Sequence, residues 1–283
     1  MSKAFETIQT TRDGAVAICE LHRPERLNAI NRRMLAELQA YLDQVEADEQ
    51  VRVVVLSGAG RAFCSGFDLK DDASAGTKGV LGWREILQQD FDMLIRWWQL
   101  SKPTIAAVHG YCIAGGMEMA MCCDVTVASS DTFFGEPELR FGTVITAMMM
   151  PWLVGPKVAK ELLLTGNDRI SAERALQVGL INQVVPQGHH LTRALELAQQ
   201  MARIDPAAAR LTKQAINRSF EIMGMREALR ASLDLAVQIE SIETLERREF
   251  QEITRRKGLK AAIAWRDARF GQPTTGPKSG AEE

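Results

Sequence analysis

Hydrophobic positions in the first half of the chain follow two spacings. Short runs rich in β-branched residues predict strands at Ala15–Leu21, Val51–Leu56, Thr104–His109 and Val125–Ala128. Between the first two runs, large apolar side chains at helical spacing predict an amphipathic helix over Asn31–Glu46. Strands with continuous apolar runs are typical of sheets covered on both faces, so the pattern predicts an α/β fold.

The pattern elsewhere is mainly helical. Asp71–Gly82 is rich in turn formers and predicts a loop that leads into a helix near Trp83. From about Pro156 onward helical spacing dominates, and Asp205 followed by proline predicts the start of one helix. The apolar residues from Ile239 to Ile253 continue as one helical stripe, and Gly258–Phe270 predicts the last helix.

Composition narrows the class of protein. The 283 residues are 46% hydrophobic and 25% charged, as in an average soluble chain, and the net charge of −2 disfavours a globally basic binder of nucleic acid or membranes. No apolar run approaches the ~18 residues of a membrane span, and residues 1–13 lack the layout of a signal peptide. Five cysteines without a Cys-x-x-Cys pair indicate reduced thiols, so we expect a cytoplasmic location.

The first segment with possible chemistry is Gly58–Lys70, directly after a predicted strand. Gly66 precedes Phe67 there, and glycine permits a turn with outward-pointing N–H groups that can receive negative charge. An ordinary strand-to-loop turn explains the same residues. The segment lacks the Gly-Lys-Ser/Thr of a phosphate-binding loop, and Ser65 lacks the setting of a nucleophile elbow.

The second segment is Ser101–Asp124, in which Gly115 opens a predicted helix. Helix N-termini present unpaired N–H groups and suit anions. Glu118 has only small or apolar neighbours three and four positions away, so its carboxylate is expected on a buried face without a cation. A glutamate that complements the helix dipole is the alternative explanation.

The third segment is Phe133–Arg140, with glutamates on both sides of Pro137. Glu136 and Arg140 have the spacing of an ion pair across one helical turn, which leaves Glu138 without a partner. Glu118 and Glu138 would suit acid–base chemistry if the fold brings them together. The four histidines show no metal-ligand spacing, so no metal is expected.

Several of these segments occur in order in one known family. The chain resembles the crotonase, or enoyl-CoA hydratase/isomerase, superfamily from about Phe5 to Phe270. The motifs that carry the resemblance are His22–Ile30 (HRPERLNAI), Arg61–Lys70 (RAFCSGFDLK), Lys102–Tyr111 (KPTIAAVHGY), Ala114–Glu118 (AGGME), Cys123-Asp124, Phe134–Glu138 (FGEPE) and the closing Gly258, Arg266 and Phe270.

The resemblance implies an α/β spiral of repeated ββα units with a helical C-terminal trimerisation region. We accordingly expect a spiral core over residues 1–195, the helical region over 196–270 and a frayed tail over 271–283. The resemblance also implies a homotrimer or a dimer of trimers (a hexamer), and a coenzyme A thioester as substrate. Coenzyme A is then part of the substrate, and no separate cofactor is expected.

The resemblance assigns roles to individual residues. The backbone amides of Phe67 and Gly115 match the family's oxyanion hole, in which preorganised donors stabilise an enolate. Ser65, Gly66, Asp68, Leu69 and Lys70 match positions along the path of the coenzyme. Lys70, and Arg266 from a neighbouring subunit, are candidates for its phosphates, although Trp265 stands where the family often has another basic residue.

The acids that are present indicate the reaction. Hydratases of the superfamily carry both glutamates, so Glu118 would deprotonate the water that adds to C3 and Glu138 would deliver a proton to C2. The resemblance thus implies an enoyl-CoA hydratase, a lyase of fatty acid metabolism. The chain departs from the hydratase pattern at Val144–Met150, whose larger side chains are expected to reshape the acyl pocket.

Two alternatives stay open from the sequence. The first is another crotonase-family reaction: isomerisation, thioester hydrolysis, C–C lysis or decarboxylation. The second is a crotonase-like RNA-binding protein, which requires a row of lysines on an exposed helix. Asn31–Glu46 carries Arg32 and Arg33 but no such row, so no nucleic-acid partner is expected, and no membrane partner either.

Overall fold

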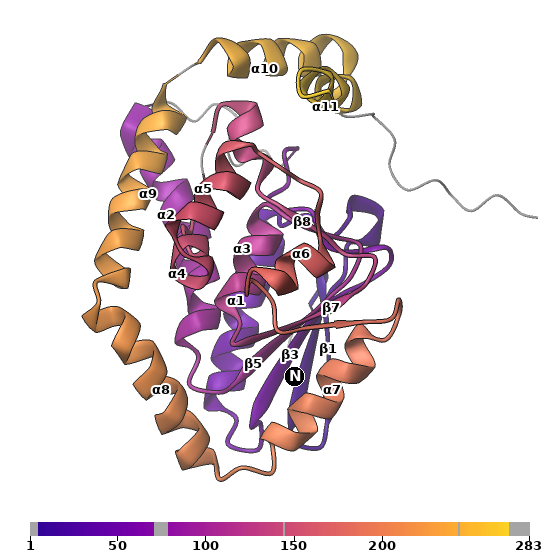
Figure 1. The fold of residues 1–283 in the computed structure, drawn as a ribbon, viewed down its shortest axis with the longest axis vertical. Helices are drawn as coiled ribbons and strands as arrows, with labels where there is room; N and C mark the ends of the chain where they lie inside the picture. The colour runs from indigo at the N-terminus through magenta and orange to yellow at the C-terminus, as the bar shows by residue number, and fades with distance from the viewer. Residues whose placement is uncertain (1–4, 71–78, 144, 243, 272–283) are drawn as a thin grey trace, which may run out of the picture.

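A six-stranded sheet and a four-stranded sheet organise the protein in the computed structural model, which describes residues 5–70, 79–143, 145–242 and 244–271. Figure 1 shows the large sheet in the lower half, with helices around it. Its strand order is β1-β2-β3-β5-β7-β10, and all neighbours except β1 and β2 run parallel. The strands are β1 (Ile8–Asp13), β2 (Val16–Leu21), β3 (Val53–Gly58), β5 (Thr104–Val108), β7 (Val125–Ser129) and β10 (Gln183–Val185). The four strands predicted from the sequence are confirmed.

The small sheet is built from the strands that follow those of the large sheet. Its order is β4-β6-β8-β9, with β4, β6 and β8 mutually parallel. The strands are β4 (Ala62–Cys64), β6 (Tyr111–Ile113), β8 (Phe133–Gly135) and β9 (Ile170–Ser171). A strand of each sheet and then a helix recur along the chain, as in β3-β4-α2 and β5-β6-α3. The predicted spiral of ββα units is therefore confirmed.

Alternating side chains of the large sheet fill two separate cores. Val54 and Leu56 of β3 belong to the larger core, which includes helices α1 (Arg32–Ala47), α2 (Gly79–Gln99) and α3 (Gly115–Cys122). Val53 and Val55 belong to the smaller core, together with alanines of α7 (His190–Met201). Both faces of β3 are covered, which explains why its residues Val53–Leu56 are all apolar.

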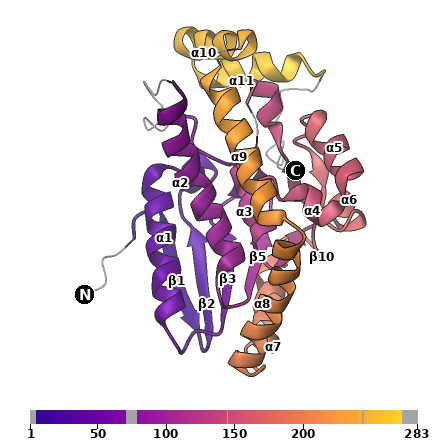
Figure 2. The same cartoon turned by 90° about the vertical axis from the view of Figure 1, so that its left-hand side faces the viewer.

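The remaining regular elements of the described chain are helices. The bounds are η1 (Pro24–Arg26), η3 (Pro137–Phe141), α4 (Met150–Val154), α5 (Pro156–Leu164), α6 (Ala172–Gln177), α8 (Pro206–Ile222), α9 (Met225–Ser241), α10 (Leu245–Lys257) and α11 (Leu259–Ala268). Figure 2 shows α9 beside α2, with α8 below it and with α10 and α11 at the top. The expected boundary after residue 195 falls inside α7, which packs on β3, β5 and β7.

Local side-chain contacts explain where several helices begin. Asn31 and Asp205 cap α1 and α8 by accepting from the amides of Met34 and Ala208, as expected of these residue types. The predicted single stripe from Ile239 to Ile253 is wrong, because α9 ends at Ser241 and Thr244 caps a new helix. The predicted loop at Asp71–Gly82 is also too long: α2 already begins at Gly79, and residues 71–78 lie outside the described part.

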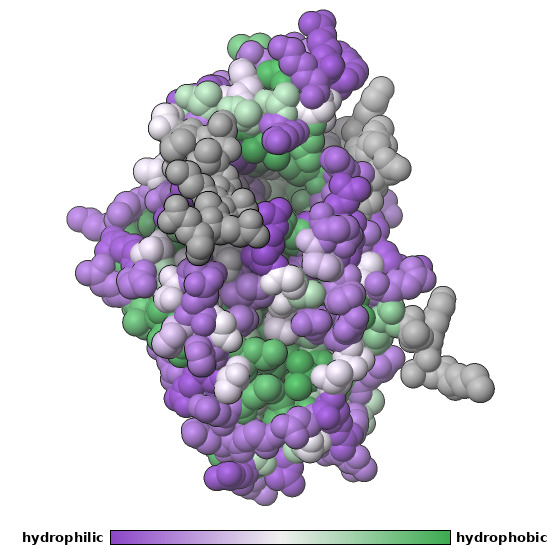
Figure 3. Space-filling model, turned by 90° about the vertical axis from the view of Figure 1, so that its right-hand side faces the viewer, coloured by the Kyte–Doolittle hydropathy of each residue, from purple (hydrophilic) through white to green (hydrophobic). Residues whose placement is uncertain are grey.

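Apolar side chains also reach the surface. Figure 3 shows hydrophobic residues within a hollow below the upper end of the molecule, and a second group lower on the same face.

All five cysteines are buried and none forms a disulfide, as expected. Within the described ranges, no helix is both long and apolar enough to span a membrane.

Candidate active site

The three parallel strands of the small sheet bring distant segments to one edge. β6 pairs with β4 on one side and with β8 on the other, so the carboxyl ends of these strands lie next to each other. Ser65–Asp68 follows β4, Gly115 opens α3 two residues after β6, and Glu136 directly follows β8. Ligands of α/β proteins commonly bind beyond the carboxyl ends of parallel strands.

A buried asparagine holds β4 and the turn before it in place. The Asn28 side chain is 0% exposed and donates to the carbonyls of Ala59 (2.8 Å), Ala62 (2.8 Å) and Phe63 (3.2 Å). Its oxygen accepts from the Arg23 amide at 2.9 Å. The amide group thus fixes the turn before β4 and the strand itself, which gives the Asn28 of the HRPERLNAI motif a structural role.

The same motif also binds the segment that follows β4. The Ile30 amide donates to the Gly66 carbonyl at 2.8 Å, and the Asp68 amide donates to the Ile30 carbonyl at 2.9 Å. Asp68 pairs with Arg23 at 2.9 Å, with both side chains largely buried. Asp68, expected on the path of the coenzyme, therefore holds the Gly66–Phe67 turn through Arg23.

Gly66 and Gly115 let this turn contact the start of α3. A Cβ on Gly66, whose φ is +92°, would lie 2.5 Å from the Ala114 Cβ and 3.2 Å from the Gly115 nitrogen. A Cβ on Gly115 would lie 2.6 Å from the Phe67 ring. Glycine is therefore required at both positions. Among the described residues, neither the Phe67 nor the Gly115 amide donates a backbone hydrogen bond.

Backbone strain lies directly before the Gly115 amide. Ala114 has φ 55° and ψ −140°, a conformation that L-residues other than glycine rarely adopt. Strain of this kind persists only where the surrounding structure enforces it, and it concentrates at functional sites. Here it orients the first amide of α3.

Glu118 lies one turn into α3 and is 1% exposed. Its two carboxyl oxygens accept from the amides of Thr146 (2.9 Å) and Ala147 (3.0 Å), which fixes the orientation of the side chain. Burial raises the pKa of Glu118 well above its ordinary value, and nearby Glu138 raises it further, whereas the two amides oppose the shift. The prediction that Glu118 is buried is confirmed. The donors come from Val144–Met150, the segment that departs from the hydratase pattern, although residue 144 itself lies outside the described part.

Glu136 and Glu138 complete an acidic cluster with Glu118. One carboxyl oxygen from each of the three lies within 4.8 Å of the others. Glu136 is 1% exposed, whereas Glu138 in η3 is partly exposed. Removal from water raises the pKa of Glu138 to about 7 and that of Glu136 well above its ordinary value. Three carboxyls at this spacing therefore disfavour one another's ionised forms.

The predicted ion pair of Glu136 with Arg140 is wrong. Arg140 pairs instead with Asp168 at 3.4 Å, and neither Glu136 oxygen has a hydrogen-bond donor among the described residues. Sequence reasoning therefore missed Glu136 as a site residue. A signal was present, because Glu136 lies two residues after the fully buried Phe134 and thus on the same face of the extended chain.

Arg266 of α11 lies beside the cluster in this chain. It is buried, pairs with Asp168 at 3.6 Å, stacks over the Phe141 ring at 4.5 Å and acts to lower the pKa of Glu138. Its predicted contact with the coenzyme of a neighbouring subunit stays a prediction. Leu69 and Lys70, by contrast, are exposed, and Ser65 is partly buried.

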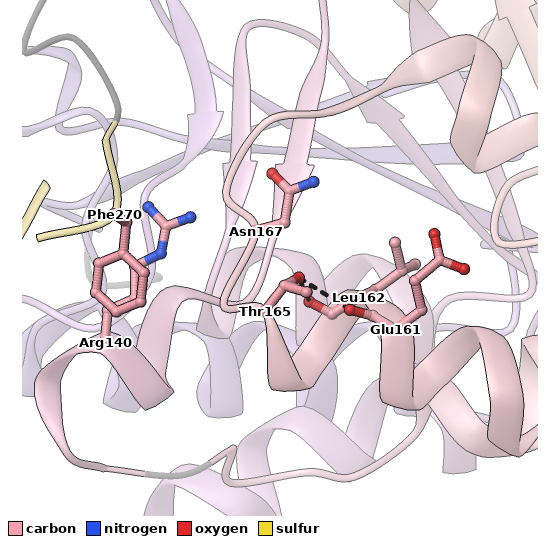
Figure 4. Close-up of a pocket in the computed structure, with 6 residues that line it drawn as sticks. All are labelled: Arg140, Glu161, Leu162, Thr165, Asn167 and Phe270. Carbon is pink, nitrogen blue, oxygen red and sulfur yellow. Dashed lines mark hydrogen bonds between the residues drawn. The ribbon is translucent and has the colours of Figure 1, made fainter.

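A separate pocket of about 340 Å³ lies beside Arg140. Figure 4 shows its lining residues, which are Arg140, Glu161, Leu162, Thr165, Asn167 and Phe270. The Arg140 guanidinium lies 4.7 Å from the centre of the Phe270 ring. None of the three clustered glutamates lines this pocket.

The acidic cluster suits two kinds of chemistry. Carboxyls that share such a site can exchange protons with a substrate, because their pKa values are raised above the ordinary range of a glutamate. Oxygen ligands at this spacing could also hold a divalent cation such as Mg²⁺ or Ca²⁺. The expectation of a metal-free and cofactor-free site stays a prediction.

Comparisons with known proteins agree with this arrangement. A family model described as enoyl-CoA hydratase/isomerase matches residues 11–273. A short-chain-enoyl-CoA hydratase of Clostridium acetobutylicum is 36% identical over 219 residues, which are 74% of this chain and 80% of that protein. A crotonyl-CoA hydratase of Syntrophomonas wolfei is 31% identical over 242 residues, covering 84% of this chain and 88% of that protein. The crystal structure of an enoyl-CoA hydratase/isomerase from Xanthobacter autotrophicus superposes with a TM-score of 0.92 at 47% identity, covering 94% of this chain and 99% of that one.

Proposed function

Because the chain belongs to the enoyl-CoA hydratase/isomerase family, we propose that it is an enoyl-CoA hydratase that adds water across the 2,3 double bond of an unsaturated acyl-CoA. The observation that carries this proposal is the convergence of Glu118 and Glu138 in one cluster at the edge where Gly66–Phe67 contacts Gly115. Hydration needs a base for water and an acid for C2, and two carboxyls with raised pKa values supply both.

Glu118 takes the proton from water in this proposal. The amides of Thr146 and Ala147 hold its carboxylate and favour its ionised form, while burial makes it a stronger base than an exposed glutamate. The hydroxide equivalent adds to C3. The fixed orientation reduces the motion needed to reach the transition state.

Glu138 delivers the proton to C2. Its pKa of about 7 keeps a large fraction protonated at neutral pH, and its partial exposure leaves one side open to a substrate. We expect the rate to fall as pH rises through about 7, because the acid is then ionised.

The amides of Phe67 and Gly115 serve as the oxyanion hole. The addition places negative charge on the thioester oxygen, and donors that are free before the substrate binds stabilise that charge. Their absence from the backbone hydrogen bonds of the described chain, and the strained Ala114 that orients one of them, support this role.

The coenzyme part of the substrate follows the chain from Ser65 to Lys70. The exposed Lys70 ammonium is one candidate for a phosphate of the coenzyme, and Arg266 of a neighbouring subunit is the second. At the other end lies the segment whose amides hold Glu118, with the buried side chains of Ile145, Ala147, Met149 and Met150. These side chains narrow the region available to the acyl group.

The assembled enzyme is a homotrimer or a dimer of trimers, located in the cytoplasm and active without a separate cofactor. Large apolar side chains exposed on α8 support association, among them Leu211, Ile216 and Ile222. Light scattering measures the assembly directly. A mass of one chain, 31.4 kDa, at working concentration would exclude it.

The function is tested by incubating the protein with 2-enoyl-CoA esters of several chain lengths and following the loss of the conjugated thioester absorbance. We expect Glu118→Gln and Glu138→Gln each to lower kcat by at least about 100-fold. Glu161→Gln, a change at an exposed glutamate that lines the separate pocket, is the matched control. Wild-type rates in either site variant exclude the two-acid mechanism, and a product that keeps a shifted double bond indicates an isomerase.

A further inference from the structure

Glu136 is a buried carboxyl that the two-acid mechanism does not use. Both of its oxygens lack a donor among the described residues, and so does one oxygen of Glu138, its neighbour in the cluster. An ionised carboxylate can only accept hydrogen bonds, so two facing carboxylates satisfy each other only when one of them holds a proton. A single proton on Glu136 turns this pair of acceptors into a donor and an acceptor.

We infer that Glu136 is a positioning residue that stays protonated and donates a hydrogen bond to Glu138, which fixes the orientation of Glu138 and favours its ionised form. This inference rests on the proposed function of Glu138. Glu136 touches neither the water nor the thioester in this account and acts only through Glu138.

The surroundings of the cluster decide which carboxyl keeps the proton. Glu118 accepts hydrogen bonds from two backbone amides. The ionised form of Glu138 is favoured by a hydrogen bond from its own backbone amide and by the positive charge of Arg266. Glu136 has neither kind of support, and it is as deeply buried as Glu118. Burial and the two neighbouring glutamates raise the pKa of Glu136 well above its ordinary value.

Other titratable groups around the cluster do not change which carboxyl keeps the proton. Glu136 acts electrostatically on the Cys112 thiol, but burial raises the pKa of that thiol well above its ordinary value, so it stays neutral. Asp90 acts on Glu118, and Asp168 pairs with Arg140 and Arg266. Glu136 is therefore the member of the cluster for which ionisation is least favourable.

Two substitutions distinguish a protonated Glu136, which donates a hydrogen bond to Glu138, from an ionised Glu136, which places a negative charge beside it. Glu136→Leu removes the donor to Glu138, so we expect the alkaline fall of kcat/KM to move to higher pH by about one unit. Glu136→Gln keeps a donor in the form of an amide N–H, so its fall should stay within about half a unit of the wild type. If Glu136 is instead ionised, both variants remove a negative charge and move the fall to lower pH. That result, or no shift in either variant, overturns the inference.

A spectroscopic readout keeps this test separate from the proposed function. Infrared difference spectra at pH 8 report protonated carboxyl groups whether or not the protein hydrates enoyl-CoA. We expect Glu136→Leu and Glu136→Gln each to lose the absorption of one protonated carboxyl. Glu37→Gln is the control, because the hydrogen bonds to Thr7, Arg33 and Glu6 lower the pKa of Glu37 to about 2 despite the opposing burial, so that carboxyl is ionised. Unchanged absorption in the Glu136 variants contradicts the inference, even if the protein proves to be a hydratase.

Discussion

At the scale of single residues, the site depends on groups held in unfavourable states. Glu118 and Glu136 are buried carboxyls, and Ala114 has a backbone conformation suited to glycine. Each lowers the stability of the folded chain, and each lies where the proposed reaction takes place. Such costs are expected where function and stability compete.

Ala114→Gly is expected to stabilise the protein. Glycine adopts φ 55° without steric strain, and the relief of about 1–3 kcal/mol exceeds the added entropy of the unfolded chain, for a net gain of about 1 kcal/mol. Unfolding by urea measures the change. Ala228→Gly, at an exposed position inside α9, should cost about 1 kcal/mol by the same measurement. A loss of stability in Ala114→Gly would show that Ala114 is not strained.

Glu138→Gln is expected to change how stability depends on pH. The pKa of Glu138 is about 7 in the folded chain, against 4.5 for the free group. Its contribution to the free energy of unfolding is therefore fully present below about pH 4.5 and is lost as pH rises through 7. Glutamine does not titrate. The free energy of unfolding of the variant, relative to wild type, should therefore increase by about 2 kcal/mol between pH 5 and pH 8. A constant difference across this range contradicts the raised pKa.

The residue scale also marks the limit of sequence reasoning. The apolar neighbours of Glu118 in its helix predicted burial, because helical spacing fixes which side chains share a face. The role of Glu136 could not be predicted in the same way. Its spacing to Arg140 suits an ion pair in a regular helix, but η3 is a short 3-10 helix and Arg140 turns to Asp168 instead.

At the scale of elements, the HRPERLNAI motif supports the site without reaching it. Asn28, Arg23 and Ile30 bind the strand and the turn that carry Gly66 and Phe67. The sequence motif alone showed a resemblance, but the hydrogen bonds that explain it join residues about 35 positions apart. No local pattern predicts contacts of that kind.

Asn28→Ala tests this support. The change leaves three buried carbonyls and one amide without their partner, so we expect a loss of about 3 kcal/mol in stability and a lower kcat as the Phe67 amide shifts. Asn217→Ala is the comparison, since that side chain donates to the Trp98 carbonyl. It should lose about 1 kcal/mol with kcat unchanged. Full stability in Asn28→Ala would remove the structural role of the motif.

At the scale of the whole molecule, the spiral explains how the site is assembled. Each ββα unit adds one short strand to the small sheet, and the turn after each strand arrives at the same edge. Phe67, Gly115 and Glu138 therefore lie at one edge although 71 positions separate the first from the last in sequence. The strands, most helices and the spiral could be predicted, because they depend on local periodicity and on the family motifs. The meeting of the acids depends on strand register, which a single sequence does not specify.

The central claim is that Glu118 and Glu138 act together on one thioester. The most direct measurement is a double-mutant cycle on the initial rate of 2-enoyl-CoA hydration, using wild type, Glu118→Gln, Glu138→Gln and the double variant. The account predicts that each single variant loses at least about 100-fold in initial rate. The double variant is expected to be at most about tenfold slower than the slower single variant, because the effects of groups that act together are not additive. Wild-type turnover in either single variant, or losses that multiply fully in the double variant, would contradict it.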